Sequence, residues 1–207
     1  PTFTSAADDA AIIGGGQTIN ITTVAADADA QNITLYVCNS TNVNATGCID
    51  THYCNNTNET NPSCAFAVEA DDATHTWYAY LYDSLNESAA ASKSGTYTTD
   101  STPPTITIIA PSNNTYASSP SASISLSEAG SWVGHCVDDC ASNTSLNMSS
   151  PTYWEGAIED LAEGSYNITF YANDSYGNMN HTSVIFTIVF TASDDDAPII
   201  TVDLPGN

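Results

Sequence analysis

Six cysteines carry the most definite chemistry in this sequence. Their even number favours disulfide bonds, and the C-x9-C-x5-C-x9-C spacing of the first four differs from the short C-x2-4-C pairs of zinc sites. We predict a local bridge within "HCVDDC". The other four allow three pairings: we favour the sequential one (38–48 and 54–64), because short loops close most easily, and keep open the nested one (38–64 and 48–54), which would join two strands flanking an insertion. The six residues are Cys38, Cys48, Cys54, Cys64, Cys136 and Cys140.

Asparagines in glycosylation sequons form the second chemically defined group. Thirteen of the 19 Asn residues begin an N-x-S/T sequon, whereas the share of Ser and Thr, 51 of 207 residues, would place only about five there by chance. The excess predicts a coat of N-linked glycans and an exported surface protein; the alternative is that strands rich in Ser, Thr and Asn contain sequons incidentally. The sequons begin at Asn20, Asn32, Asn39, Asn44, Asn55, Asn58, Asn86, Asn113, Asn143, Asn147, Asn167, Asn173 and Asn180.

The charged residues are almost all acidic. The sequence has 24 Asp and Glu but a single cation, Lys93, so its formal net charge is −23. Without a basic patch the chain is not expected to bind nucleic acid, and cations or neutral glycans are the partners that this charge allows. No apolar stretch approaches the ~18 residues of a membrane span, so we expect no membrane insertion of this segment. The first residue, Pro1, indicates a processed product or part of a longer chain.

Known catalytic patterns are missing from the sequence. Its histidines lie in different segments without an H-E-x-x-H pair, and there is neither a G-x-S-x-G nor a P-loop motif. We therefore predict that the chain is not an enzyme. A glycan-binding module is the competing interpretation: Trp154 and Tyr153 would form an exposed stacking platform, whereas Trp77 and Trp132 are assigned to sandwich cores. The four histidines are His52, His75, His135 and His181.

Alternating apolar residues predict that β-strands position these groups. Runs such as 32–38, 121–128 and 165–172 have a period of two and are separated by turn residues at the spacing expected of a sandwich. The stretch "LAEGSY" has the L-x-x-G-x-Y pattern of a tyrosine corner at Tyr166. We predict an all-β protein made of two tandem immunoglobulin-like β-sandwiches.

An internal repeat sets the predicted domain boundaries. The stretches "STPPTITIIAPSNN" (101–114) and "DDDAPIITVDLPGN" (194–207) share a pattern in which Pro104, Ile106 and Pro111 match Pro198, Ile200 and Pro205. The offset is 94 residues, the size of one sandwich. We predict sandwiches over 1–100 and 101–193, with a Cys-rich insertion at 38–64 between central strands of the first. Residues 194–207 are predicted to be an acidic linker followed by the first strand of a further domain.

That last predicted strand would expose its apolar side chains if it had no sheet to join. Two outcomes remove the problem. Either a longer chain continues with the rest of the domain, or the strand adds to a sheet of the next subunit and so builds a fibre by head-to-tail contacts. The apolar residues concerned are Ile199, Ile200, Val202 and Leu204.

Several stretches resemble known families of surface proteins. "DSTPPTITIIAPSNNTY", "GSYNITFYANDSYGN" and "DDDAP" are similar to tandem immunoglobulin-like repeats of archaeal surface proteins, including surface-layer and filament-forming ones. "VAADADAQNITLYV" and "SDDDAP" resemble the A-x-D-x-D-x-x-N segment and the D-x-N-D-N-A-P linker of cadherins, although Asp replaces the Asn residues of that linker. The archaeal resemblance implies a fold and a cell-surface setting rather than an activity.

The cadherin resemblance implies a calcium site, because in that family these elements bind calcium between successive domains. Clustered carboxylates supply the oxygen ligands that a hard cation needs. A solvated acidic linker is the alternative. The implied ligands are Asp27, Asp29, Asp194, Asp195 and Asp196.

Together these observations predict a glycosylated extracellular structural protein at the cell surface. It would form a filament or a layer by self-association, with N-linked glycans and calcium as its non-protein components. The alternative is a glycan-binding or adhesive immunoglobulin-like module of a larger surface protein.

Overall fold

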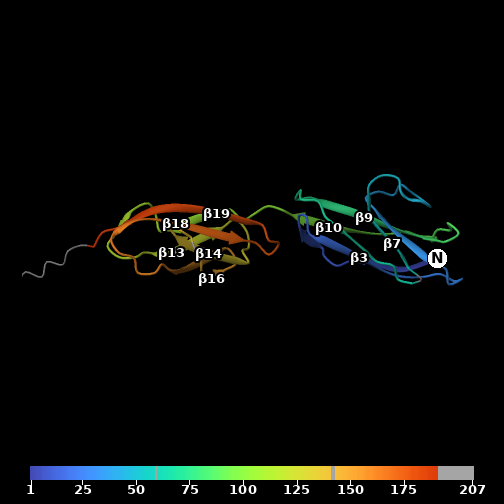
Figure 1. Ribbon diagram of the computed structural model, residues 1–207, viewed down its shortest axis with the longest axis horizontal. Coiled ribbons are helices and arrows are strands. Elements are labelled where there is room, and N and C mark those ends of the chain that lie inside the picture. Colours follow the sequence, from blue (N-terminus) through green and yellow to red (C-terminus); the bar gives the residue numbers. More distant parts are fainter. Residues whose placement is uncertain (59, 141–142, 191–207) are drawn as a thin grey trace, which may run out of the picture. The chain divides into compact units, whose positions relative to one another are not determined.

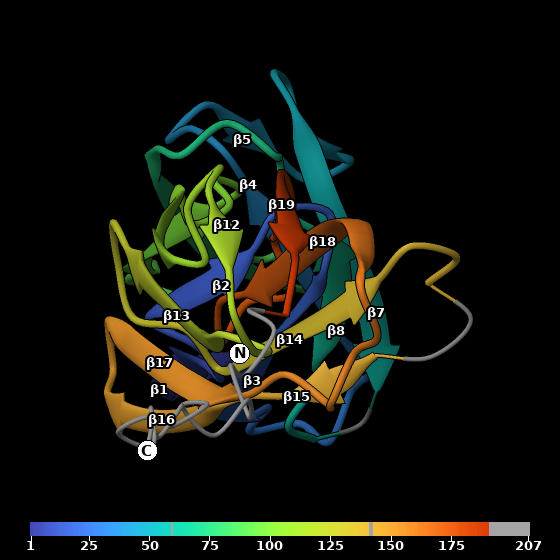
Figure 2. The ribbon, with the colours of Figure 1, turned by 90° about the vertical axis from the view of Figure 1, so that its left-hand side faces the viewer.

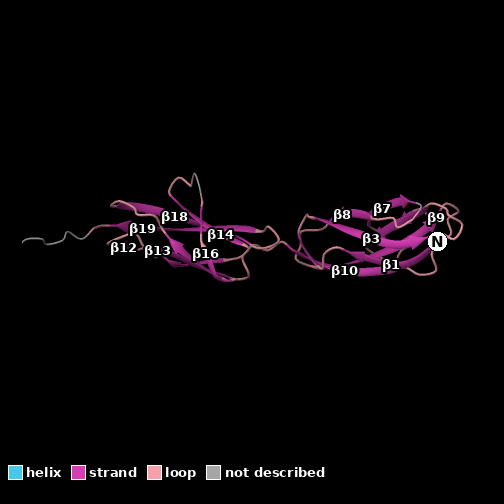
Figure 3. Cartoon of the chain, turned by 90° about the horizontal axis from the view of Figure 1, so that it is seen from below, coloured by secondary structure: helices cyan, strands magenta, loops and turns pink. Residues whose placement is uncertain are grey.

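The computed structural model describes residues 1–58, 60–140 and 143–190, and within these ranges every regular element is a β-strand (Figures 1 and 3). The chain forms two compact units. The first comprises Pro1–Pro104 with Ala129–Ser131 and Asn173–Asn180; the second comprises Thr105–Glu128, Trp132–Ala172 and the described residues from His181 onward. Among the described residues, no helix has the length and hydropathy of a membrane-spanning segment.

The first unit is a sandwich of two sheets. Its strands are β1 (Thr2–Asp8), β2 (Ile12–Gly14), β3 (Thr18–Ala26), β4 (Ile33–Cys38), β5 (Val43–Asn44), β6 (Gly47–Cys48), β7 (His52–Asn58), β8 (Cys64–Ala67), β9 (Thr74–Asp83) and β10 (Lys93–Asp100). One sheet has the order β1-β3-β8 and the other the order β2-β10-β9-β4-β7, while β5 and β6 form a separate hairpin. The Cys-rich stretch therefore contributes a sheet strand, β7, besides the hairpin.

The second unit is also a sandwich of two sheets. Its strands are β11 (Ile106–Ala110), β12 (Thr115–Tyr116), β13 (Ser121–Leu126), β14 (Trp132–Val137), β15 (Thr144–Ser145), β16 (Asn147–Ser150), β17 (Tyr153–Ala157), β18 (Gly164–Asn173) and β19 (Met179–Ile188). The sheet orders are β11-β13-β17-β16 and β12-β19-β18-β14-β15. Figure 2 shows β16 beside β17 at the edge of the four-stranded sheet.

In both units the first two strands, which follow one another closely in the sequence, join different sheets. In the first unit β1 pairs antiparallel with β3, and β2 then pairs parallel with β10. In the second unit β11 pairs antiparallel with β13, and β12 then pairs parallel with β19. With the other strands in the same relative places, this is the strand order of an immunoglobulin-like sandwich, so the predicted fold class is confirmed.

Alternation along the strands builds the core of the first unit. Trp77, Ala79 and Leu81 of β9 are buried, as their spacing predicts. The Trp77 side chain lies across Gly95, its partner on β10: a Cβ atom at that glycine would lie 2.5 Å from indole Cζ2. The indole Nε1–H donates a 2.8 Å hydrogen bond to Asp8 Oδ2, which satisfies its one polar group.

The core of the second unit is organised around β18. Ile168, Phe170 and Ala172 are fully buried, and the Tyr166 hydroxyl donates a 3.1 Å hydrogen bond to the carbonyl oxygen of Ala162. A bond from this tyrosine to the backbone a few residues upstream is the defining contact of a tyrosine corner. The prediction at Tyr166 is therefore confirmed.

Two tryptophans of the second unit are placed differently from expectation. Trp132 was expected in the core, but its neighbour Val133 faces inward instead, and the partly exposed Trp132 indole lies across Gly134 on the outer face of the sheet. In the competing glycan-binding interpretation Trp154 would face solvent, but only 6% of it is exposed and it packs in the core. The glycan-binding alternative therefore loses the platform on which it was based.

Candidate functional site

The disulfides tie together strand ends and sheet edges. The pairing is the sequential one, and it places the second bridge between β7 and β8, which are edge strands of different sheets. That bridge joins the two sheets of the first unit along one side. Three such bonds indicate an oxidising, extracellular environment. They are Cys38–Cys48, Cys54–Cys64 and Cys136–Cys140, with Cα–Cα distances of 5.6, 5.9 and 5.0 Å.

Strand β11 shows what the repeated sequence motif does inside a sandwich. Ile106 and Ile108 pack against the core of the second unit, whereas Thr107 and Ile109 are exposed. The strand contacts its own sheet through β13 alone, and the buried Pro111 follows it. The corresponding C-terminal residues Ile199, Ile200, Val202 and Leu204 lie outside the described residues.

The thirteen sequon asparagines all reach the surface of the described structure. Nine are exposed and four are partly exposed, so none is enclosed in a core. Asn180 differs from the others in one respect, because its side-chain Nδ2, the atom that would carry a glycan, donates a 3.1 Å hydrogen bond to the carbonyl oxygen of Pro104. The four partly exposed residues are Asn20, Asn167, Asn173 and Asn180.

The acidic residues expected to bind calcium are only partly within the described structure. Asp27 Oδ1 accepts hydrogen bonds from the backbone N–H groups of Asp29 and Gln31. Its Oδ2 lies 3.0 Å from the amino nitrogen of Pro1. The Pro1 amino group, followed by the Gln31 backbone bond, holds the pKa of the Asp27 carboxyl below its usual range. Asp29 is exposed, and the acidic run 194–196 lies outside the described residues.

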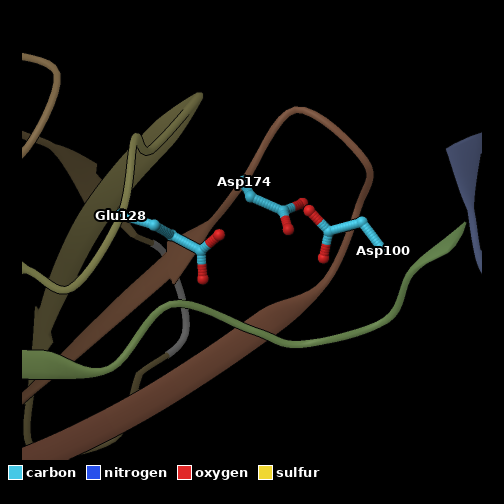
Figure 4. A group of neighbouring side chains, drawn as sticks. All are labelled: Asp100, Glu128 and Asp174. Atoms are coloured by element: carbon cyan, nitrogen blue, oxygen red, sulfur yellow. The ribbon is translucent and has the colours of Figure 1, made fainter. Parts of the chain in front are cut away.

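A different group of carboxylates is brought together by the fold. Carboxylate oxygen atoms of Asp100 and Asp174, both in the first unit, lie within 4.8 Å of each other (Figure 4). Asp174 is buried and accepts hydrogen bonds from the backbone N–H groups of Tyr176 and Asn178 and from Asn178 Nδ2. Sequence patterns missed the group because its members lie far apart along the chain. Since bonds within the chain already engage Asp174, we assign no metal to it.

The histidines do not assemble a catalytic arrangement in the described structure. His75 Nε2 and the Thr99 hydroxyl both contact Oδ1 of Asp71, at 2.9 and 2.8 Å. The carboxylate is thus the shared partner, and no hydroxyl–imidazole bond of an activated nucleophile is formed there. The His75 and Thr99 side chains hold the pKa of the Asp71 carboxyl below its usual value. The group is best understood as a structural link between β9 and β10.

His135 is a buried histidine of β14 that no sequence pattern singled out. It is 3% exposed, and its Nδ1 has no hydrogen-bond partner among the described residues. A cavity of about 190 Å³ lies beside it, lined also by Thr144 and Glu159. Burial lowers the pKa of the imidazole, and the nearby Glu159 carboxylate opposes that effect only in part.

Acidification to pH 5 is expected to destabilise the second unit through His135. Because the folded-state pKa lies below the unfolded value of about 6.5, the unfolded chain binds more protons as the pH falls through that value, and the free energy of unfolding falls. Thermal melting at pH 8 and pH 5 should show a smaller difference for His135→Gln than for the wild type. His52→Gln, at an exposed histidine, should retain the wild-type difference. An unchanged pH dependence in His135→Gln would contradict this assignment.

Comparisons with known proteins find only distant structural similarities. No protein-family model matches the chain, and no curated protein matches it significantly. Fibronectin(III)-like modules of CbhA from Clostridium thermocellum superpose with a TM-score of 0.42 at 16% identity, covering 95% of this chain and all of theirs. The FN1–FN3 domains of chicken CNTN1 superpose with a TM-score of 0.40 at 12% sequence identity, and the match covers 90% of this chain and 67% of theirs. The IG1+IG2 domains of DIP-gamma superpose with a TM-score of 0.38 at 7% sequence identity, and the match covers 91% of this chain and 98% of theirs. Similarities this low carry no information on function.

Proposed function

We propose that this chain is a glycosylated extracellular structural protein whose immunoglobulin-like sandwiches are linked head to tail. The linkage is made by residues 194–207, which contribute the first strand of a further sandwich. That sandwich belongs either to the same chain or to another copy, and the assembly is a filament or a layer at the cell surface. The chain has no catalytic role in this proposal.

One observation carries the proposal: the sequence of the C-terminal repeat has apolar residues at the positions that correspond to the core-packed residues of β11. The β11 residues that pack against the core, Ile106 and Ile108, correspond to Ile200 and Val202, both apolar. The exposed positions 107 and 109 correspond to Thr201 and Asp203, both polar. A segment with apolar residues at alternate positions is suited to cover one face of a sandwich core, as β11 does.

The chemistry of the surface supports the extracellular part of the proposal. Three disulfides close loops and sheet edges, which suits an oxidising environment outside the cell. Thirteen sequons with accessible positions suit a glycan coat. With a single Lys and no Arg, the chain can form few ion pairs between copies, so main-chain hydrogen bonds and apolar packing are the contacts available for assembly.

Removal of residues 197–207 is expected to abolish end-to-end assembly while leaving both described units folded. Electron microscopy and sedimentation of the native and truncated chains measure the assembly. In the full chain, Val202→Asp should have the same effect, because it places a charge at a core-facing position of the strand. Thr201→Asp is the matched control at an outward-facing position and should assemble normally.

Normal fibres from the truncated chain would contradict linkage through this strand. The intact mass of the native material separates the two forms of the proposal. A chain of about the 21.7 kDa sequence mass plus its glycans indicates subunits that polymerise, whereas a much larger chain indicates a tandem array.

Calcium at Asp27, Asp29 and the acidic run 194–196 stays a separate proposal. A cation bound by the folded state alone raises apparent stability, so a chelator should lower the melting temperature. A melting curve that chelation leaves unchanged would remove calcium from this account.

A further inference from the structure

The outer face of the five-stranded sheet in the first unit carries a cluster of tyrosines. In the register of β4 and β9, Tyr36 lies directly opposite Tyr80, and the neighbouring pairs place Tyr78 and Tyr82 on the same face. All four are partly exposed, whereas the intervening Ala79 and Leu81 are buried in the core. Tyr36 and Tyr82 contact edge to face, with ring centroids 6.0 Å apart. The face is therefore broad, aromatic and accessible.

This tyrosine face, defined by Tyr36, Tyr78, Tyr80 and Tyr82, is also free of acidic side chains. On β9 and the segments of β4 and β10 paired with it, every residue on this face is Tyr, Thr, Ser or Cys. A chain with 24 acidic residues thus presents a neutral surface rich in hydroxyl groups here. Such a surface suits a neutral ligand with apolar C–H faces and many hydroxyl groups, which is the chemistry of a saccharide.

The Cys-rich hairpin covers one part of the tyrosine face. The Cys38–Cys48 bridge ties β6 to the end of β4, and the buried Gly47 approaches the ring of Tyr36 so closely that a Cβ atom there would lie 3.3 Å from Cε1. His52 lies near the same ring, with centroids 6.1 Å apart. The hairpin is thus a wall beside Tyr36, and Tyr80 lies one strand farther from β7.

A sequon asparagine stands at the border of this face. Asn55 of β7 pairs directly with Tyr36, so its side chain is on the outer face, and it is exposed. Asn55, Tyr36 and Tyr80 form one row across three neighbouring strands. Two strand spacings separate Asn55 from Tyr80, a span of about 10 Å that the first few sugar rings of a glycan would cross.

We propose that a glycan attached to Asn55 lies across the tyrosine face and packs on Tyr80. Its pyranose C–H faces stack on the phenol rings, and its hydroxyl groups bond to the phenol and threonine hydroxyls of the face. The glycan thereby shields this aromatic surface and is held in one direction instead of moving freely. This inference rests on the proposed glycosylation of the chain and adds a specific position and contact to it.

Tyrosine accessibility in native, glycosylated protein tests the proposal. Hydroxyl-radical labelling followed by mass spectrometry should modify Tyr80 several-fold faster in Asn55→Gln than in the wild type. Thr57→Val, which removes the same sequon at another residue, should expose Tyr80 in the same way. Thr57→Ser keeps the sequon and should leave Tyr80 protected. Labelling of Tyr171, in the second unit, should be equal in all variants and serves as the internal reference.

Glycopeptide mass spectrometry of the same samples separates the possible failures. If Asn55 carries a glycan and Tyr80 is labelled equally with and without it, the contact is disproved while glycosylation stands. If Asn55 is bare but other sequons are occupied, the inference fails and the proposed glycan coat survives. If no sequon is occupied, the proposed glycan coat fails together with the inference. Protection of Tyr80 that depends on protein concentration, in all variants alike, would assign the face to a second copy of the chain and overturn the inference.

Discussion

Trp77→Ala is expected to lower the free energy of unfolding of the first unit by about 3–5 kcal/mol, the usual loss for a tryptophan removed from a core. Trp77 is 1% exposed, and its ring fills the space above Gly95. The substitution also removes the 2.8 Å hydrogen bond that Asp8 Oδ2 accepts from the indole N–H. Calorimetry should show the melting temperature of this unit reduced by more than about 10 °C.

Trp132→Ala is the matched control for that prediction. Trp132 also lies across a glycine, Gly134, but on the outer face of a sheet, where it is partly exposed and donates a 3.0 Å bond to Ser145 Oγ. Its removal should cost about 1 kcal/mol or less. A loss at Trp132 as large as that at Trp77 would contradict the placement of Trp132 outside the core.

Replacement of both Cys54 and Cys64 by alanine is expected to destabilise the first unit by about 3 kcal/mol, the value for a closed loop of this length. The sequence separation is 10 residues. The bridge joins β7 to β8, the edge strands of the two sheets, and the three-stranded sheet has no further strand beyond β8. In the second unit, β16 covers the corresponding strand β17. The bridge thus substitutes for an edge strand, and the loss should appear in thermal or denaturant unfolding.

The Cys136–Cys140 bridge provides the comparison. It closes a separation of four residues, so its removal by paired alanine substitutions should cost about 2 kcal/mol and should affect the second unit. If removing Cys54–Cys64 proves no more destabilising than removing Cys136–Cys140, the edge-closing role of the longer bridge would be contradicted. Non-reducing peptide mapping confirms that each variant keeps the other two bonds.

Local patterns in the sequence were sufficient for the strands and for some specific contacts. Period-two alternation in β9 predicted that Trp77, Ala79 and Leu81 face inward, because a pleated strand alternates its side chains between two faces. The tyrosine corner at Tyr166 was predictable because the contact closes within four residues of the chain. Loop closure favoured the sequential disulfide pairing, which the structure has, over the nested pairing that the sequence left open.

Alternation failed where two adjacent apolar residues compete for one inward position. In β14 the sequence Trp132–Val133 allows either residue to face the core, and Val133 does so. In β17 the glycan-binding interpretation placed Trp154 outward, but Trp154 packs against the core, while its neighbour Glu155 is exposed. Pairing with neighbouring strands decides between such alternatives, because a shift by one residue exchanges the faces of a whole strand.

By itself the sequence determined the all-β class and the immunoglobulin-like type of sandwich, and it indicated that the six cysteines form local disulfides, since these features depend on residue type and short spacing. Only the tertiary structure decided that Asn55 borders the tyrosine face and that His135 is buried with no hydrogen-bond partner for Nδ1 among the described residues. Each of these depends on the register of strands that are distant along the chain. Register is set by the packing of the two sheets against each other. Because that packing involves many strands at once, it cannot be read from any short stretch of the sequence.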